Sequence, residues 1–130
     1  KKKLKEDFFK DEFLISSLLS IIDKFLKIHI KKQVEAGATI IQIFDSWAGL
    51  LEKNIPEYIY TPTLSLVEYT KSLDVPAICF PRGIKDYKSF CDIVKPSVVN
   101  IDYEVDPKDI VKKIDTKDKR TTHWVPEIQI

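Results

Sequence analysis

The chain has 130 residues, the size of one domain, and its 44% apolar and 32% charged residues are ordinary for a globular protein. Lys and Arg number 21 and Asp and Glu number 20, so the net charge of +1 gives no field that favours nucleic acid or an anionic membrane. No long apolar run follows the basic start, so we expect neither a signal peptide nor a membrane span, and we expect a cytoplasmic location.

The first predicted element is a helix from Asp11 or Glu12 to Ala36. Apolar residues recur there at steps of three and four, and Gly37 provides the stop. His29 lies beside this stripe without a carboxylate partner suggested by the sequence, so we expect a surface or interfacial histidine rather than a general base. The stripe consists of Phe13, Leu14, Ser17, Leu18, Ile21, Ile22, Phe25 and Ile28.

A buried strand is predicted near residues 39–44, because this run is rich in β-branched residues and too short for a typical helix. Asp45 and Ser46 follow at the carboxyl end of the strand. In parallel α/β proteins, ligands bind at that end, because the strand is followed there by a loop at the mouth of the sheet. We therefore expect any functional site to begin at these two residues.

Three helices and two further strands are predicted after this loop. The first helix covers about residues 57–72 and should be kinked or broken at Pro62. Strands near 76–80 and 97–102 flank a short helix at 86–94. A last helix begins with Asp106 as N-cap and Pro107 in its first position. Alternation of helices and strands in this way predicts a parallel sheet.

Three parallel strands make an incomplete sheet. Their apolar character on both faces requires cover, and the outer strands would leave open edges. The pattern is therefore typical of part of a (β/α) TIM-type barrel, with about three parallel strands and flanking helices. A complete barrel needs about 250 residues. An open three-layer sandwich is the alternative that periodicity leaves open.

The tail and the cysteines add little chemistry. Residues 115–130 begin with a polar run and show no helical stripe or clear strand–helix rhythm. Cys79 and Cys91 belong to no C-x-x-C pair and have no histidine at ligand spacing. We therefore expect two reduced, partly buried thiols and no metal site.

Four short stretches, in order, resemble the signature of the uroporphyrinogen decarboxylase family. They are QVEAGA at 33–38, QIFDSWAG at 42–49, VPAICFPRG at 75–83 and VNIDY at 99–103. The resemblance covers about residues 4–114, so residues 1–114 are expected to form a decarboxylase-like barrel segment. Residues 115–130 do not resemble the family, and a truncated or frameshifted reading frame would explain them. The related corrinoid and cobalamin methyltransferases share the A-G-A turn but carry a His/Cys zinc site, which this sequence lacks.

The resemblance implies a (β/α)₈ barrel, commonly a homodimer, that removes the acetate carboxyl groups of uroporphyrinogen in haem biosynthesis. It implies no metal and no organic cofactor, because the protonated pyrrole itself can accept the electrons released with carbon dioxide. The implied partners are the tetrapyrrole substrate in the complete enzyme and either a second copy or a complementing chain.

Ser46 matches the loop serine that the family uses as a hydrogen-bond donor to substrate. Asp45, Arg82 and Asp102 are candidate cleft neighbours, for which a salt bridge or support of a loop is the alternative. For Ser46 the alternative is a helix N-cap or a turn hydroxyl. Trp47 is expected to pack beneath the loop.

The family's arginine-rich motif, its key aspartate, its substrate tyrosine and its late histidine have no counterpart in this sequence. The chain alone is therefore expected to be inactive. Two alternatives are a non-catalytic α/β segment that associates with a complementary chain, and a methyltransferase-like relative.

Overall fold

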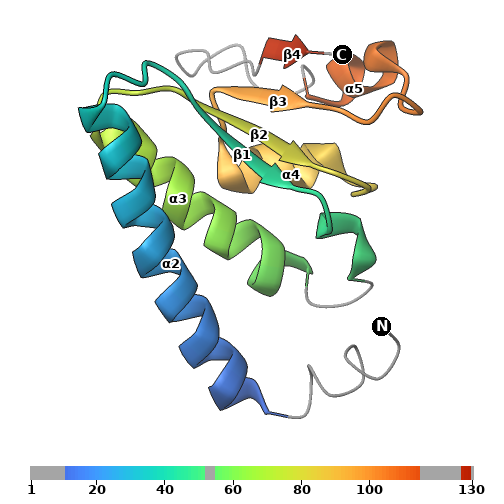
Figure 1. The fold of residues 1–130 in the computed structure, drawn as a ribbon. Helices are drawn as coiled ribbons and strands as arrows, with labels where there is room; N and C mark the ends of the chain where they lie inside the picture. Colours follow the sequence, from blue (N-terminus) through green and yellow to red (C-terminus); the bar gives the residue numbers. More distant parts are fainter. Residues whose placement is uncertain (1–10, 52–54, 115–126, 130) are drawn as a thin grey trace.

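A computed structural model describes residues 11–51, 55–114 and 127–129 (Figure 1). The expectations for residues 1–10 and for most of the tail, 115–126 and 130, lie outside these ranges. The elements in chain order are α2 (Glu12–Glu35), β1 (Ile41–Asp45), a 3₁₀ turn η1 (Ala48–Leu50), a π-helical turn η2 (Pro56–Tyr60), α3 (Thr61–Ser72), β2 (Ala77–Pro81), α4 (Tyr87–Val94), β3 (Val98–Asn100), α5 (Pro107–Ile114) and β4 (Glu127–Gln129).

The strands form one parallel sheet in the order β1-β2-β3-β4. Sequential order and parallel pairing confirm the three predicted strands and the partial α/β barrel. The fourth strand was not predicted, because three residues are too few to show a period.

One face of the sheet is covered by helices. Figure 1 shows α4 behind the strands and α2 lying along α3, and α3 contacts both β2 and α4. Burial alternates along β1 and β2, so that Ile41, Ala77 and Cys79 are buried while Gln42 and Phe44 are exposed. The side chains of Gln42, Phe44, Ile78, Phe80, Val98 and Asn100 share the other side, which we call the open face.

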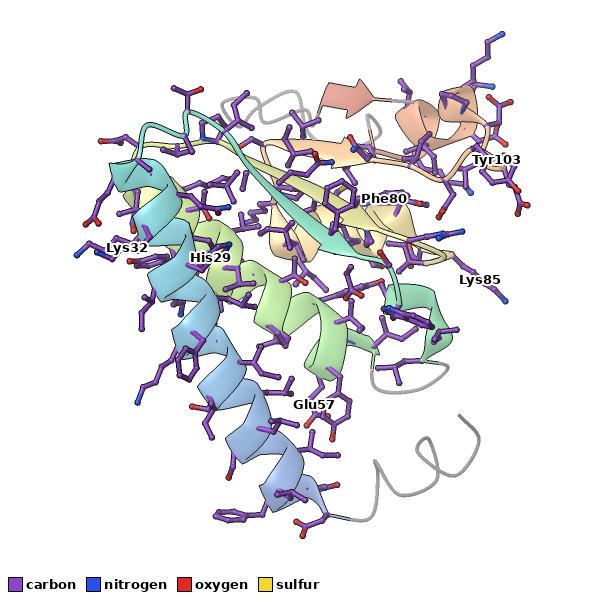
Figure 2. The ribbon with its side chains drawn as sticks, in the orientation of Figure 1. His29, Lys32, Glu57, Phe80, Lys85 and Tyr103 are labelled. Carbon is purple, nitrogen blue, oxygen red and sulfur yellow. The ribbon has the colours of Figure 1, made fainter. Side chains whose placement is uncertain are left out.

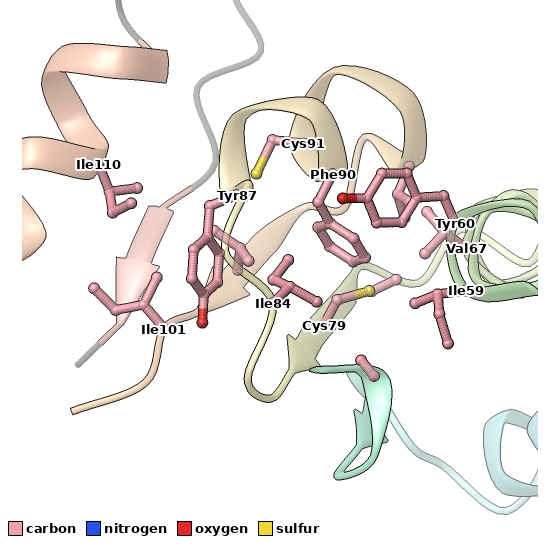
Figure 3. Packing of buried hydrophobic residues seen from close by; sticks show 14 residues of the cluster. Ile59, Tyr60, Val67, Cys79, Ile84, Tyr87, Phe90, Cys91, Ile101 and Ile110 are labelled. Atoms are coloured by element: carbon pink, nitrogen blue, oxygen red, sulfur yellow. The ribbon is translucent and has the colours of Figure 1, made fainter. Parts of the chain in front are cut away.

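The main core lies between the covered face and helices α3, α4 and α5. Tyr60 and Phe90 pack edge to face there, with their ring centroids 5.5 Å apart (Figure 3). The cluster also includes Val67, Ala77, Cys79, Ile84, Tyr87, Cys91, Val94, Val99, Ile101 and Ile110. A smaller cluster of Ile30, Ile41, Leu66 and Val75 joins α2 and α3 to β1.

Local sequence signals set the element ends. The Asp11 carboxylate caps α2 by accepting from the Leu14 amide at 2.9 Å, and Gly37, with φ +103°, follows its end. The segment does not break into two separate helices at Pro62. The π-helical turn η2 runs directly into α3 with helical backbone at Tyr60 and Thr61, and Pro62 lies in the first turn of α3, where the wider π turn before it accommodates a residue without an amide proton.

Most of the apolar stripe of α2 is exposed. The helix buries Ile15 and Ile30 and contacts α3, whereas its other side carries large apolar residues open to solvent. We call this the outer face of α2; it consists of Phe13, Leu14, Leu18, Ile21, Ile22, Phe25, Leu26 and Ile28.

Candidate functional site

Ser46 lies in a tight turn directly after β1. The Asp45 carboxylate closes this turn by accepting from the Trp47 amide at 3.1 Å. The N-cap position of η1 is Trp47, without a side-chain bond, so Ser46 does not cap it. Ser46 is exposed, and within the described ranges its hydroxyl makes no hydrogen bond. Its hydroxyl is therefore available to a ligand.

The loop after β2 holds the Ser46 loop at both ends. The Arg82 amide donates to the Asp45 carbonyl at 3.0 Å, and the Arg82 carbonyl accepts from the Gly49 amide at 2.9 Å. Gly49 lies against Gly83 so closely that a Cβ at Gly49 would be 2.2 Å from the Gly83 carbonyl oxygen. Only glycine fits at this position unless the loops separate.

Asp102, after β3, holds the loop that follows β2. Its Oδ2 atom accepts from the Gly83 amide at 2.7 Å and from the Tyr87 hydroxyl at 2.8 Å. The Tyr87 hydroxyl in turn accepts from the Asp102 amide at 3.1 Å. Burial raises the pKa of Tyr87, so the hydroxyl keeps the proton that it donates.

The structure thus brings all four predicted site residues to the carboxyl edge of the sheet, in different chemical situations. The carboxylates of Asp45 and Asp102 are engaged with backbone amides. The Arg82 side chain is exposed and forms no ion pair with any described residue. Ser46 and Arg82 are therefore the groups that can donate to a carboxylate ligand, and a guanidinium suits that geometry.

The expectation for Trp47 is wrong, whereas His29 lies at the surface as expected. Trp47 was expected to pack beneath the loop and is instead 61% exposed; the buried residue under the loop is Ala48. A small side chain fits there because the loops after β1 and β2 approach so closely. His29 is exposed on α2, and Figure 2 shows it far from Lys85 and Tyr103, which follow β2 and β3.

Asn100 is a polar residue of the open face that sequence reasoning did not select. The register continued by one residue places it beside Phe80, near the carboxyl end of β3. Its Oδ1 atom is buried and has no hydrogen-bond partner among the described residues. The signal that could have singled it out is an amide in a strand otherwise rich in valine and isoleucine.

A hollow of about 480 Å³ lies on the outer side of the sheet, between α2 and the first turns of the second helical segment. Asp23, Glu57 and Ser65 line it, and none of its lining residues comes from a strand end. It is therefore separate from the Ser46 turn.

Within the described ranges, no three His, Cys, Asp or Glu side chains gather as a group that could hold a metal. Cys79 and Cys91 are both buried and unpaired, and burial raises the pKa of each to about 12. None of the described helices is both long and apolar enough to span a membrane.

The sequence model of a family described as "Uroporphyrinogen decarboxylase (URO-D)" matches residues 1–122. A uroporphyrinogen decarboxylase of Rickettsia bellii is 33% identical over 102 residues, which are 75% of this chain and 30% of the relative. Those of Campylobacter jejuni (strain 81-176) and Helicobacter hepaticus are 35% and 33% identical over 88 residues, which are 65% of this chain and 26% of each relative. The chain therefore spans less than a third of the length of these relatives.

Proposed function

The chain belongs to the uroporphyrinogen decarboxylase family, and we propose that it contributes an arc of barrel and one substrate-binding hydroxyl to an enzyme that decarboxylates the acetate side chains of uroporphyrinogen. This activity would serve haem biosynthesis, and no organic or metal cofactor is needed in the proposal. The family resemblance and the position of Ser46 at the carboxyl end of β1 support it.

The observation that carries the proposal is the exposed Ser46 hydroxyl, which makes no hydrogen bond to any described residue and lies in a turn closed by its neighbour Asp45. A hydroxyl held there can donate one hydrogen bond to a substrate carboxylate. Such a bond to a charged group contributes about 1.5–3 kcal/mol. Its loss corresponds to roughly a ten- to hundredfold effect on the rate. We propose that the exposed Arg82 guanidinium, in the loop whose backbone is bonded to Asp45 and Gly49, attracts the same carboxylates.

The chain's own groups do not complete the proposed reaction. Decarboxylation requires that a proton reach the pyrrole or the departing carbon and that the cationic ring be stabilised. The carboxylates of Asp45 and Asp102 each commit one oxygen to holding a loop, and the arginine-rich motif, key aspartate, substrate tyrosine and late histidine of the family have no counterpart in this sequence. We therefore propose that the 130 residues alone do not turn over substrate.

The test uses Ser46→Ala introduced at the matching position of a complete relative. We expect kcat/KM to fall roughly ten- to hundredfold. Ser72→Ala is the matched control, because Ser72 is also exposed but donates within its own helix, to the Tyr69 carbonyl. An unchanged kcat/KM in Ser46→Ala would reject the substrate contact. Turnover by the purified 130-residue chain would reject the need for further groups.

A second candidate, association with a complementing chain or a second copy, is favoured by the open face. Phe44 on this face is 64% exposed and pairs with Phe80, at 6.0 Å between ring centroids. Strands that are apolar on both faces are normally covered on both. Co-expression with the remaining barrel sequence of a relative should give a stable complex, and two chains that separate on a sizing column would argue against it.

A further inference from the structure

The loops after β1, β2 and β3 are joined in series by a few identifiable contacts. The Asp102 carboxylate holds the Gly83 amide, Gly83 lies against Gly49, and Gly49 closes the loop that begins with Ser46. These residues come from three different crossovers of the fold, so each contact links distant parts of the sequence.

We propose that Asp102 is a positioning residue, which fixes the Ser46 turn through the Gly83–Gly49 backbone contact and is itself oriented by Tyr87. The effect of Asp102 on substrate binding rests on the proposed function of Ser46. The restraint of the Ser46 loop by Asp102 does not depend on that function.

The Asp102 carboxylate is held in one orientation. Oδ2 accepts two hydrogen bonds, from the Gly83 amide at 2.7 Å and from the Tyr87 hydroxyl at 2.8 Å. The Tyr87 ring is buried in the main core, beside Ile84 and Ile101 (Figure 3), so its hydroxyl is a fixed donor. A charged acceptor strengthens both bonds.

Gly83 transmits this restraint to Gly49. Gly83 has φ +80°, a conformation that favours glycine, and its carbonyl lies against the Gly49 Cα. The adjacent Arg82 backbone is bonded to Asp45 on one side of Ser46 and to Gly49 on the other. A shift of the Gly83 turn must therefore move or release the Ser46 loop.

The first test measures amide hydrogen exchange by mass spectrometry in the whole 130-residue chain, a method that tolerates self-association. Asp102→Ala should accelerate exchange in residues 45–51 about tenfold, because the charged acceptor that anchors the loops is lost. Exchange in α3 should stay unchanged. In Asp102→Asn, exchange in residues 45–51 should be faster than in the unchanged chain but slower than in Asp102→Ala, because the amide oxygen can still accept from the Gly83 amide.

Asp92→Ala is the matched control, because it removes an exposed carboxylate of α4 that pairs with Lys88 and should leave residues 45–51 unchanged. If Asp102→Ala also accelerates hydrogen exchange in α3, Tyr87→Phe distinguishes a local effect from general loss of stability. This variant keeps the buried ring and removes only the hydroxyl. Faster exchange at 45–51 but not in α3 in that variant supports the proposal. Unchanged exchange at 45–51, or equal acceleration everywhere in both variants, overturns it.

The second test uses a complete relative that carries the same residues at these positions. Asp102→Ala should lower kcat/KM about tenfold, and Asp102→Ala combined with Ser46→Ala should be no worse than Ser46→Ala alone, because residues that act through one contact are not additive. Independent, additive losses would overturn the positioning role. If Ser46→Ala has no effect, the proposed function fails while the exchange result still stands.

Discussion

The two faces of the sheet are built from alternate residues of the same strands, yet they have opposite surroundings. On the covered face, Ala77, Cys79 and Val99 are buried beneath the helices. On the open face, Phe44 is 64% exposed and packs edge to face on Phe80, which is only partly buried. A parallel strand normally carries apolar residues on both faces because both are buried. The difference indicates that the open face is suited to a further apolar layer, as in the interior of a barrel.

The comparison is sharpest for two phenylalanines that each belong to an edge-to-face pair. Phe90, 1% exposed, packs on Tyr60, and Phe44 packs on Phe80. We expect Phe90→Ala to lower the free energy of unfolding by about 3–5 kcal/mol, because it leaves a cavity in the core. Phe44→Ala should cost less than about 1 kcal/mol, since most of its ring already contacts water.

Urea unfolding followed by circular dichroism measures both changes. The two variants remove the same atoms, so each controls for the other. Equal losses of stability would mean that the open face is covered in solution, by a second copy or by another part of the chain, and the contrast between the faces would be lost.

Thiol reactivity tests the same contrast with a smaller expected effect. Burial raises the pKa of Cys79 and Cys91 to about 12, so both thiols stay protonated in the folded chain where an exposed thiol ionises. Alkylation at pH 8 should be at least about a hundredfold slower than for a cysteine introduced by Phe44→Cys on the open face. Mass spectrometry of the alkylated peptides gives the rates.

The raised pKa values of the two buried thiols also determine whether the stability of the folded chain rises or falls with pH. The unfolded thiols ionise near their ordinary pKa of about 8.5, whereas the folded ones hold their protons to about 12. The unfolded chain therefore binds fewer protons in this window, and stability should fall as pH rises from about 9 to 12. Rapid alkylation of Cys79 at pH 8 in the folded chain would contradict the closed core.

The sequence predicted the elements that depend on local chemistry. The three strands and the start of α5 at Pro107, capped by Asp106, whose Oδ1 accepts from the Lys108 amide at 2.9 Å, were predicted from short-range signals. Proline lacks an amide proton, and an aspartate before a helix supplies an acceptor, so these signals do not need tertiary context.

What the sequence did not predict depends on contacts between distant segments. The apolar stripe of α2 predicted a helix, but not that most of the stripe would face solvent. Ala48, rather than Trp47, is buried beneath the loop because Gly49 contacts Gly83 closely and leaves little space. No local sequence pattern reveals that contact. The engagement of Asp102 by Gly83 and Tyr87 is likewise a contact between loops.

Self-association tests the contrast between the two faces of the sheet with the smallest expected effect. The outer face of α2 is a second exposed apolar surface besides the open face, and either surface could drive association. Contiguous apolar patches of this kind promote association. We expect oligomers of the 130-residue chain in light scattering, more of them in sulfate, which strengthens apolar burial. Phe25→Lys should weaken association about tenfold, since burying one phenylalanine contributes about 1.5–3 kcal/mol.

Gln33→Lys is the control, because it adds the same charge at an exposed polar position of the same helix and should leave association unchanged. Equal weakening by both variants would mean that charge repulsion, rather than loss of apolar contact, explains the change. A monomer that unfolds in one sharp transition would show that neither the outer face of α2 nor the open face drives association. Weakening by Phe25→Lys alone would assign the association to α2, and the open face would then remain available for the rest of a barrel.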